Sequence, residues 1–310
     1  MTTLVGDVGG TNCRLAVATR RKEGGFELHD LERYSVREHR GIEECIASYT
    51  ERHSIEPTQI GVAAAGPKFD DGIRMTNISW QIGEGELRDR FQLERAVVIN
   101  DFVGMATGAT VMPPDAFSTV VHGTLDWTET VTVLGPGTGM GISIVTPDGV
   151  LGTEGGHVSF APETVREIAI LQFLLRRRDY VSWENLVSGP GLMRIYKALC
   201  DIKGEPSVIE TTPALTDAAG LSGTPREAVM AFCGLLGAYA GNAALIHGSK
   251  GGVVIAGGVA RHVAPYFAES NLARRFRERG SGSWFVEHIP VHHMHAHSVA
   301  LHGVASLLLK

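Results

Sequence analysis

The chain has 310 residues, of which 44% are hydrophobic, and it carries a formal net charge of −6. This length is sufficient for a substantial core and for two domains. The acidic balance, without a basic stripe, argues against a nucleic-acid-binding protein. No signal peptide and no uninterrupted apolar run of transmembrane length are recognisable. The cysteines lack metal or redox spacing, so we expect a cytoplasmic protein without disulfides; they are Cys13, Cys45, Cys200 and Cys233.

The predicted elements, taken in chain order, alternate between strands and helices. Apolar runs rich in β-branched residues predict strands at 4–8, 13–18, 61–65, 96–99, 131–134, 141–145 and 253–256. Helical patterns predict helices at 41–53, 162–178, 190–199, 225–247 and 299–309. Strand pairs followed by helix–strand alternation indicate an α/β protein with a mixed sheet. The turn residues 113–115 are a plausible crossing point between two lobes, and the last helix is expected to pack on the first lobe.

Two turns in the chain have the same design. Residues 4–17 and 131–144 each contain an apolar run, a glycine turn with threonine, and a second apolar run. This pattern predicts a strand, a tight turn and a strand, and consecutive N–H groups in such a turn can bind an anion. Either turn alone is typical of an ordinary hairpin. The pair suggests a duplicated fold that holds a polyphosphate from both sides.

The common nucleotide motifs do not describe these turns. The chain contains no G-x-x-x-x-G-K-[ST] phosphate loop, and the alternating glycines from Gly135 to Gly141 do not match the G-x-G-x-x-G fingerprint. Asp7 precedes the first turn and could hold Mg²⁺ directly or through water, because this cation prefers oxygen ligands. A third apolar run ends in Gly257-Gly258, and we assign it to the adenosine half of a nucleotide, with a turn that binds no ligand as the alternative.

Polar residues that could perform chemistry follow predicted strands. Asp101 could accept a proton from a substrate hydroxyl, with Asn100 as a hydrogen-bonding neighbour, although an Asx turn is the simpler interpretation of this pair. Glu154 and His157 flank two glycines, and Glu184 precedes a Pro-Gly loop. Together these residues suggest a pocket for a small polyol, whereas each alone is typical of a surface turn. The spacing is not H-E-x-x-H, so a zinc protease is unsupported.

Five histidines gather near the C-terminus. They are His292, His293, His295, His297 and His302. Alternating histidines on a strand could bind a metal, but no carboxylate or cysteine accompanies them at a familiar spacing. We therefore expect a surface or edge-strand position for this segment.

The ordered set of motifs resembles the bacterial glucokinases of the hexokinase/actin-like ATPase superfamily. The matching segments are residues 6–12, 99–102, 135–139, 154–158, 160–162, 186–192 and 255–258. The resemblance implies a two-lobed actin-like ATPase (ribonuclease H-like) α/β fold with mixed sheets and an interdomain cleft. It places a small domain at 1–110, completed by residues 298–310, and a large domain at 111–297. It also implies a cytoplasmic homodimer. Related ROK-type proteins follow a Glu-x-Gly-His segment with closely spaced zinc-binding cysteines, but here the next cysteine is Cys200, so no zinc is expected.

The resemblance also implies roles for individual residues. Asp101 matches the catalytic base of the family, and the glucose-binding positions match Asn100, Asp101, Glu154, His157 and Glu184. The nucleotide-binding positions match Gly6, Asp7, Val8, Gly9, Gly10, Thr11, Gly137, Thr138, Gly139, Gly257 and Gly258. The implied reaction is transfer of the ATP γ-phosphoryl group to the 6-hydroxyl of glucose, with Mg²⁺ at Asp7.

Three alternatives remain open at this point. A kinase for another hexose, such as mannose, fructose or an N-acetylhexosamine, would share these residues. A non-catalytic sugar sensor is opposed by the full set of phosphate turns and by the lack of a recognisable N-terminal helix-turn-helix. An actin-like filament or chaperone ATPase is opposed by the sugar-binding set Glu154, His157 and Glu184.

Overall fold

The computed structural model describes residues 2–22, 24–76, 78–220 and 222–309. The chain separates into two compact units. Unit 1 comprises residues 1–116, 150–152 and 296–310, and unit 2 comprises residues 117–149 and 153–295. The two units are described separately.

Unit 1 is built on a five-stranded mixed sheet with the strand order β3-β2-β1-β4-β8. These strands are β1 (Thr3–Val8), β2 (Asn12–Arg20), β3 (Phe26–Ser35), β4 (Gln59–Ala64) and β8 (Arg95–Asn100). β1 pairs antiparallel with β2 and parallel with β4, which pairs parallel with β8. A small sheet of β5 (Lys68–Phe69), β6 (Gly72–Arg74) and β7 (Gln81–Gly83) lies between β4 and β8 in the chain.

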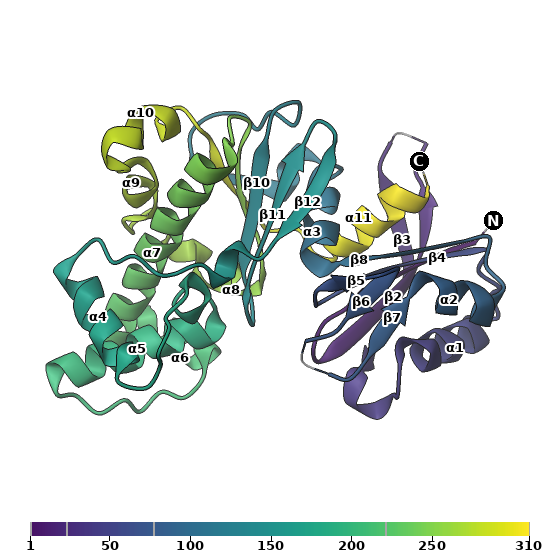
Figure 1. Cartoon of the computed structure of the whole chain (residues 1–310), viewed down its shortest axis with the longest axis horizontal. Coiled ribbons are helices and arrows are strands. Elements are labelled where there is room, and N and C mark those ends of the chain that lie inside the picture. The colour runs from purple at the N-terminus through teal and green to yellow at the C-terminus, as the bar shows by residue number, and fades with distance from the viewer. Residues whose placement is uncertain (1, 23, 77, 221, 310) are drawn as a thin grey trace. The chain divides into compact units, whose positions relative to one another are not determined.

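Helices cover both faces of this sheet (Figure 1). They are α1 (Ile42–His53), α2 (Glu84–Phe91), α3 (Asp101–Ala109) and α11 (Val299–Leu308). Successive residues of a strand point to opposite faces, and β1 follows this rule. Leu4 and Val8 belong to the core cluster beneath α1, whereas Val5 packs with α11. The sheet is therefore buried on both sides, and the C-terminal helix belongs to the same unit as the first strand.

Unit 2 contains a six-stranded sheet with the order β12-β11-β10-β13-β14-β9. Its strands are β9 (Phe117–Val121), β10 (Val131–Pro136), β11 (Met140–Thr146), β12 (Gly149–Thr153), β13 (Gly252–Ile255) and β14 (Val291–Met294). β10 pairs antiparallel with β11 and parallel with β13, and β13 pairs parallel with β14. The arrangement β2-β1-β4-β8 of unit 1 therefore recurs as β11-β10-β13-β14, as the two similar glycine turns suggested.

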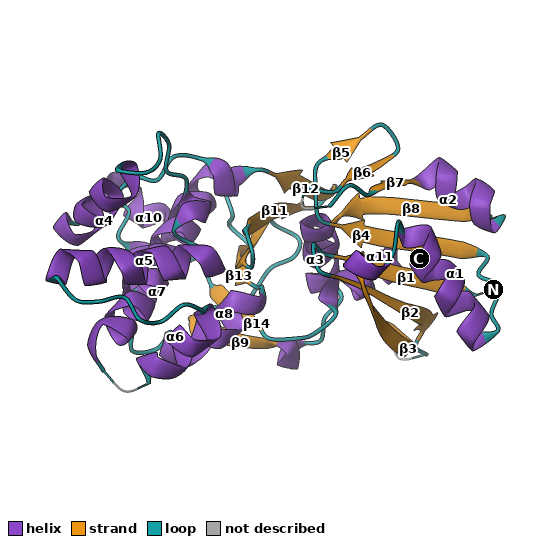
Figure 2. Ribbon diagram, turned by 90° about the horizontal axis from the view of Figure 1, so that it is seen from below, coloured by secondary structure: helices purple, strands orange, loops and turns teal. Residues whose placement is uncertain are grey.

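The helices of unit 2, purple in Figure 2, include one long apolar helix against which several of the others pack. They are α4 (Val165–Leu175), α5 (Gly189–Lys203), α6 (Thr212–Ala219), α7 (Gly223–His247), α8 (Gly258–Val263), α9 (Leu272–Arg277) and α10 (Ser283–Val286). Among the described residues, α7 alone is long and apolar enough to cross a membrane by length and composition, but 72% of that apolar window is buried inside the protein. Its apolar composition is accounted for by its place in the core.

Every predicted strand and helix is present, which confirms the α/β prediction. Several further elements were not predicted, chiefly β3, β9, α2 and the small sheet of β5 to β7. β3 is an edge strand with many half-buried and exposed charged residues, so its apolar pattern is weak.

For the histidine-rich segment the edge-strand expectation is wrong, whereas His295 and His297 are exposed, as a surface position requires. β14 carries His292 and His293 and lies between β13 and β9, so it is not an edge strand. The unpredicted β9 covers its outer side. The His293 side chain is 4% exposed, and its ring packs edge-on against Phe267 with centroids 5.6 Å apart. Its Nε2 atom has no hydrogen-bond partner among the described residues.

Glycines allow α3 and α11 to approach very closely in unit 1. A Cβ atom on Gly303 would lie 2.0 Å from the backbone oxygen of Gly104, and one on Gly108 would lie 2.0 Å from the oxygen of Val299. We expect Gly303→Ala to lower the free energy of unfolding by about 1–3 kcal/mol, because a rigid backbone must move to admit the methyl group. Urea unfolding followed by circular dichroism measures this loss.

The matched control is Gly234→Ala in the middle of α7. There the nearest atom to an added Cβ lies 3.9 Å away, so the methyl group fits. Alanine also favours a helix over glycine by roughly 0.5–1 kcal/mol. Equal destabilisation by the two substitutions would contradict the packing argument.

Acid should destabilise the protein through His293. Burial, with His295 and Arg261 nearby, lowers its pKa from 6.5 to about 4. As the pH falls, the unfolded chain binds a proton at this histidine before the folded chain does. The contribution of the neutral His293 to the free energy of unfolding is therefore fully present above about pH 6.5 and is lost as the pH falls towards 4. Between pH 7 and pH 5 the loss is about 2 kcal/mol. Urea unfolding at several pH values in this range should show this additional loss of unfolding free energy in the parent protein and not in His293→Leu. If the free energies of the two proteins fall in parallel with pH, the role of His293 is refuted.

Candidate active site

Asp7 lies near the end of β1, opposite Arg14 of β2 in the antiparallel register. The Arg14 Nη1 atom is 3.5 Å from Asp7 Oδ2, and the Asp7 side chain is 21% exposed. The pKa of Asp7 is raised to about 6, chiefly by burial. The charge of Arg14 lowers this pKa and that of Asp101 raises it, which places the two carboxylates within electrostatic reach of each other.

Asn100 and Asp101 form the junction between β8 and α3. Asn100 is the N-cap of α3, and its Oδ1 accepts hydrogen bonds from the N–H groups of Phe102 (2.9 Å) and Val103 (3.2 Å). Its Nδ2 donates to the carbonyl of Gly66 at 3.0 Å. An amide side chain has two acceptor sites and two N–H donors, so one N–H remains for a ligand. The Asx-type turn is therefore present, but it does not use all the hydrogen-bonding groups of the Asn100 side chain.

Asp101 is the first residue of α3. Its Oδ1 accepts a hydrogen bond of 2.9 Å from the N–H of Phe102. The positive end of the helix dipole and this N–H both favour the charged carboxylate. Unit 1 thus brings Asp7, Asn100 and Asp101 to the carboxyl ends of the parallel strands β1 and β8, where α/β sheets bind ligands.

Unit 2 brings together the three remaining polar residues. His157 ends a short 3₁₀ turn, Gly155–His157, and Glu184 lies within another, Trp183–Asn185. The Nε2 atom of His157 is 3.6 Å from Glu154 Oε2, and its Nδ1 atom is 4.0 Å from Glu184 Oε1. The imidazole lies between two carboxylates that are separated by thirty positions in the sequence, and the three groups can meet neighbouring hydroxyls of one ligand.

Glycines make this convergence possible. A Cβ on Gly156 would lie 2.3 Å from the carbonyl oxygen of Met140, so the turn beside His157 can rest on the start of β11 only without a side chain. A Cβ on Gly139 would lie 2.6 Å from Glu184 Oε2. That oxygen accepts a hydrogen bond of 2.9 Å from the N–H of Met140, which ties Glu184 to the second glycine turn.

Each glycine turn uses its first N–H group internally. Gly9 donates to the carbonyl of Asn12 at 2.9 Å, and Gly137 donates to the carbonyl of Gly139 at 2.8 Å. These two N–H groups close the turns, so an anion would have to be met by later residues of each turn. Gly257 has φ +91° and lies against the second turn, where a Cβ would be 2.6 Å from the carbonyl oxygen of Pro136.

Sequence reasoning missed two residues beside these groups. Arg14 faces Asp7 because the hairpin pairs Val8 with Cys13. Aligning the two predicted strands about their turn would have predicted this pair. Tyr239 of α7 lies behind the sugar-type residues: its hydroxyl is 3.2 Å from where a Cβ of Gly155 would be, and it has no hydrogen-bond partner among the described residues. No short-range signal in the sequence connects α7 with that turn.

The carboxylates do not form a ready-made metal site. Across the part of the chain that the structure describes, no group of three or more His, Cys, Asp or Glu side chains could hold a metal ion. The four cysteines are buried free thiols.

Comparison with known proteins identifies the family. The family profile described as Glucokinase matches residues 4–310. A glucokinase from Saccharophagus degradans is 34% identical over 98% of this chain and 97% of its own length. One from Chromobacterium violaceum is 36% identical over 98% of this chain and 88% of its own length.

Solved structures agree with this relationship. The crystal structure of a glucokinase from an Antarctic psychrotroph covers 100% of this chain and 99% of its own with a TM-score of 0.88 and 28% identity. A ROK family glucokinase from Streptomyces griseus, solved with glucose and AMPPNP, covers 99% of both chains with a TM-score of 0.71, and at 18% identity it shows the shared fold. The actin-like sugar-kinase fold is thereby confirmed, and the chain belongs to the glucokinase family.

Proposed function

We propose that this ATP-dependent glucose kinase transfers the γ-phosphoryl group of ATP to the 6-hydroxyl of D-glucose, with Asp101 as the base that accepts the hydroxyl proton. The observation that carries the proposal is the grouping of functional side chains within each unit. Asp101 starts α3 within electrostatic reach of Asp7, and Glu154, His157 and Glu184 converge in unit 2.

Asp101 suits the role of base because it is a carboxylate at the N-terminus of α3. The helix N-terminus and the N–H of Phe102 favour the carboxylate. A carboxylate within hydrogen-bond reach of the attacking hydroxyl can remove its proton as the bond to phosphorus forms. Phosphoryl transfer otherwise depends mainly on positioning and on stabilising charge.

The sugar ring is held in this proposal by Asn100, Asp101, Glu154, His157 and Glu184. Asn100 can only donate, because both acceptor sites of its amide oxygen are used by α3. The carboxylates of Glu154 and Glu184 can accept hydrogen bonds from sugar hydroxyls, and the imidazole of His157, with nitrogens 3.6 Å and 4.0 Å from these carboxylates, offers a further hydrogen-bonding group.

The nucleotide is assigned to the two glycine turns and to the Gly257-Gly258 segment. In unit 1 these positions are Gly6, Asp7, Val8, Gly9, Gly10 and Thr11, and in unit 2 they are Gly137, Thr138, Gly139, Gly257 and Gly258. Because Gly9 and Gly137 close their own turns, the phosphate contacts come from the N–H groups that follow them. The positive φ of Gly257 supports a close backbone approach at the adenosine end.

The residues around Asp7 fit a magnesium ion that arrives with the nucleotide. Burial and the charge of Asp101 raise the pKa of Asp7, and a cation would relieve both effects. Two carboxylates are too few for a protein-only cage, which agrees with the preference of Mg²⁺ for waters and phosphate oxygens. When bound, the ion would neutralise phosphate charge, while Asp7 would hold it and Asp101 would remain the base.

The remaining parts of the proposal follow from the family. They are a cytoplasmic location, a homodimeric assembly, a role in glycolysis and a division into a small domain of 1–110 with 298–310 and a large domain of 111–297. A kinase for another hexose is the nearest alternative, because residue types do not reveal hydroxyl stereochemistry.

Asp101→Asn should lower kcat by about 10²- to 10⁴-fold, because asparagine keeps the shape and cannot accept the proton. Glucose-dependent formation of glucose 6-phosphate from ATP and Mg²⁺ measures kcat, and calorimetry measures glucose binding, which should change little. A near-normal kcat would refute the assignment. Turnover by the parent protein with another hexose and not with glucose would keep the base and reassign the substrate.

Glu184→Gln should raise the KM for glucose by about tenfold or more while leaving the KM for ATP nearly unchanged. The substitution removes a charged acceptor, whose hydrogen bonds contribute about 1.5–3 kcal/mol, and keeps the bond from the Met140 N–H. The matched control is Glu210→Gln at an exposed position. Equal effects on both KM values would instead indicate a distorted glycine turn.

A further inference from the structure

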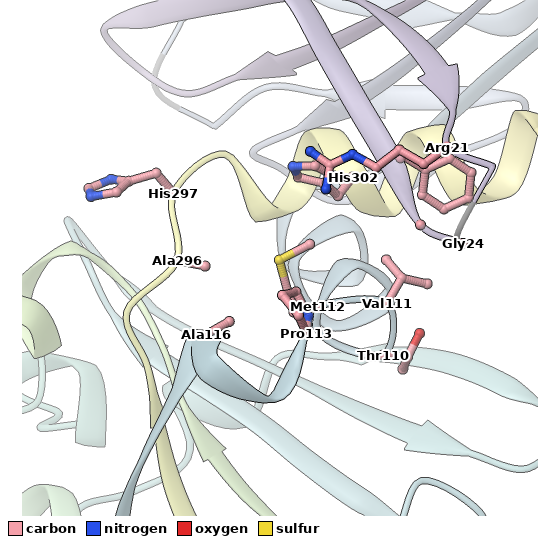
Figure 3. A pocket seen from close by; sticks show the side chains of 12 residues that line it. Arg21, Gly24, Thr110, Val111, Met112, Pro113, Ala116, Ala296, His297 and His302 are labelled. Carbon is pink, nitrogen blue, oxygen red and sulfur yellow. The ribbon is translucent and has the colours of Figure 1, made fainter.

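A cavity of about 490 Å³ lies within unit 1, away from every residue assigned above to glucose or ATP (Figure 3). It is bordered by the end of the β2–β3 hairpin, by the segment that follows α3, and by the segment that leads into α11. The side chains that matter are Arg21, Phe26, Met112, Pro113, His297 and His302.

The polar lining of this cavity contains a cation and no anion. Arg21 contributes a guanidinium group and His302 an imidazole, and none of the lining residues is acidic. Figure 3 shows the two groups next to each other. The charge of Arg21, together with burial, lowers the pKa of His302. The charge of the cavity therefore comes from Arg21, and the neutral imidazole of His302 adds one N–H donor and one acceptor beside it.

The rest of the lining is largely apolar. Phe26, Val111, Met112 and Pro113 line the cavity together with Arg21 and His302, and the glycines at 24 and 25 add no side chain to it. His297 lies apart at the rim, and its side chain points away from Arg21 (Figure 3). Pockets of this size, mostly apolar with a few convergent polar groups, are the usual form of small-molecule sites.

We propose that this cavity binds an amphipathic organic anion, whose charged group meets Arg21 and His302 and whose planar apolar part packs on Phe26, Met112 and Pro113. An anion pairs with the Arg21 guanidinium, whose paired N–H donors match a phosphate or carboxylate, and the His302 imidazole can donate an N–H to the same group. The apolar part gains from leaving water. This ligand is distinct from glucose and from the nucleotide at the glycine turns.

The cavity also lies next to the end of α3 and next to segments where the chain passes between the two units. Thr110 to Pro113 follow directly after α3, whose first residue is Asp101. Ala116 is the last residue of unit 1 before the chain first enters unit 2, and Ala296 is the first residue after the chain's final return. A ligand here contacts these two segments and the far end of the helix that begins with Asp101.

The test titrates 1-naphthyl phosphate into the whole protein by isothermal calorimetry, with glucose and Mg²⁺–AMPPNP present at saturating concentrations to occupy the kinase site. We expect one saturable site. Inorganic phosphate alone and 1-naphthol alone should each bind at least about tenfold more weakly, because phosphate lacks the apolar ring and 1-naphthol lacks the anionic group. Absence of saturable binding would overturn the proposal.

Variants locate the site. Arg21→Ala should weaken binding by about tenfold or more, since it removes a charge-assisted hydrogen bond. His302→Gln should weaken it less, because an amide N–H can still donate. The matched control is Arg20→Ala, the exposed neighbour on the same hairpin that does not line the cavity. Equal losses for Arg20→Ala and Arg21→Ala, or no loss for either, would show binding to the general surface and would refute the proposal.

Discussion

The arrangement of both units depends on one constraint, which is that a central strand pairs antiparallel with the next strand and parallel with a later one. β1 and β10 each hold this position. The hairpin turn after the central strand must then lie at the same edge as the carboxyl ends of its parallel neighbours. In unit 1 this edge collects Asp7 and Asp101, and in unit 2 it collects the turn at Gly137–Gly139 and Gly257. Residues far apart in the chain therefore meet because of strand direction alone.

Close backbone approach is the second requirement, and glycine meets it at each junction by having no side chain. Gly139 admits the carboxylate of Glu184, and Gly156 lets the turn before His157 rest on β11. At these two positions the reason is space and not an unusual φ angle. The same reason explains Gly303 at the crossing of α3 and α11, which supports the helix that begins with Asp101. The convergence of Glu184 and His157 and the packing of α3 on α11 therefore both depend on the small size of glycine.

The sequence predicted what local patterns determine and missed what depends on distant pairing. The strands around Asp7 and Asp101 have strong apolar patterns, and the glycine turns follow from short-range chemistry. The edge strand β3 is too polar to be recognised, and β9 is a short strand with exposed residues. Missing β9 caused the error for His293, because only pairing with β9 places β14 inside the sheet. Tyr239 shows the same limit, since a helix residue meets the Gly155 turn only through tertiary packing.

Asp7 and Asp101 lie at the same edge of the five-stranded sheet of unit 1 but in different surroundings. Asp7 lies within the sheet, where burial raises its pKa and Arg14 offsets part of that effect. Asp101 lies one step beyond the end of β8, at a helix N-terminus that favours its charged form. A carboxylate that gains from a nearby cation and one that lies at a helix N-terminus are suited to different tasks. The different surroundings of Asp7 and Asp101 are the physical basis for proposing different roles for them, although both are aspartates at one edge of one sheet.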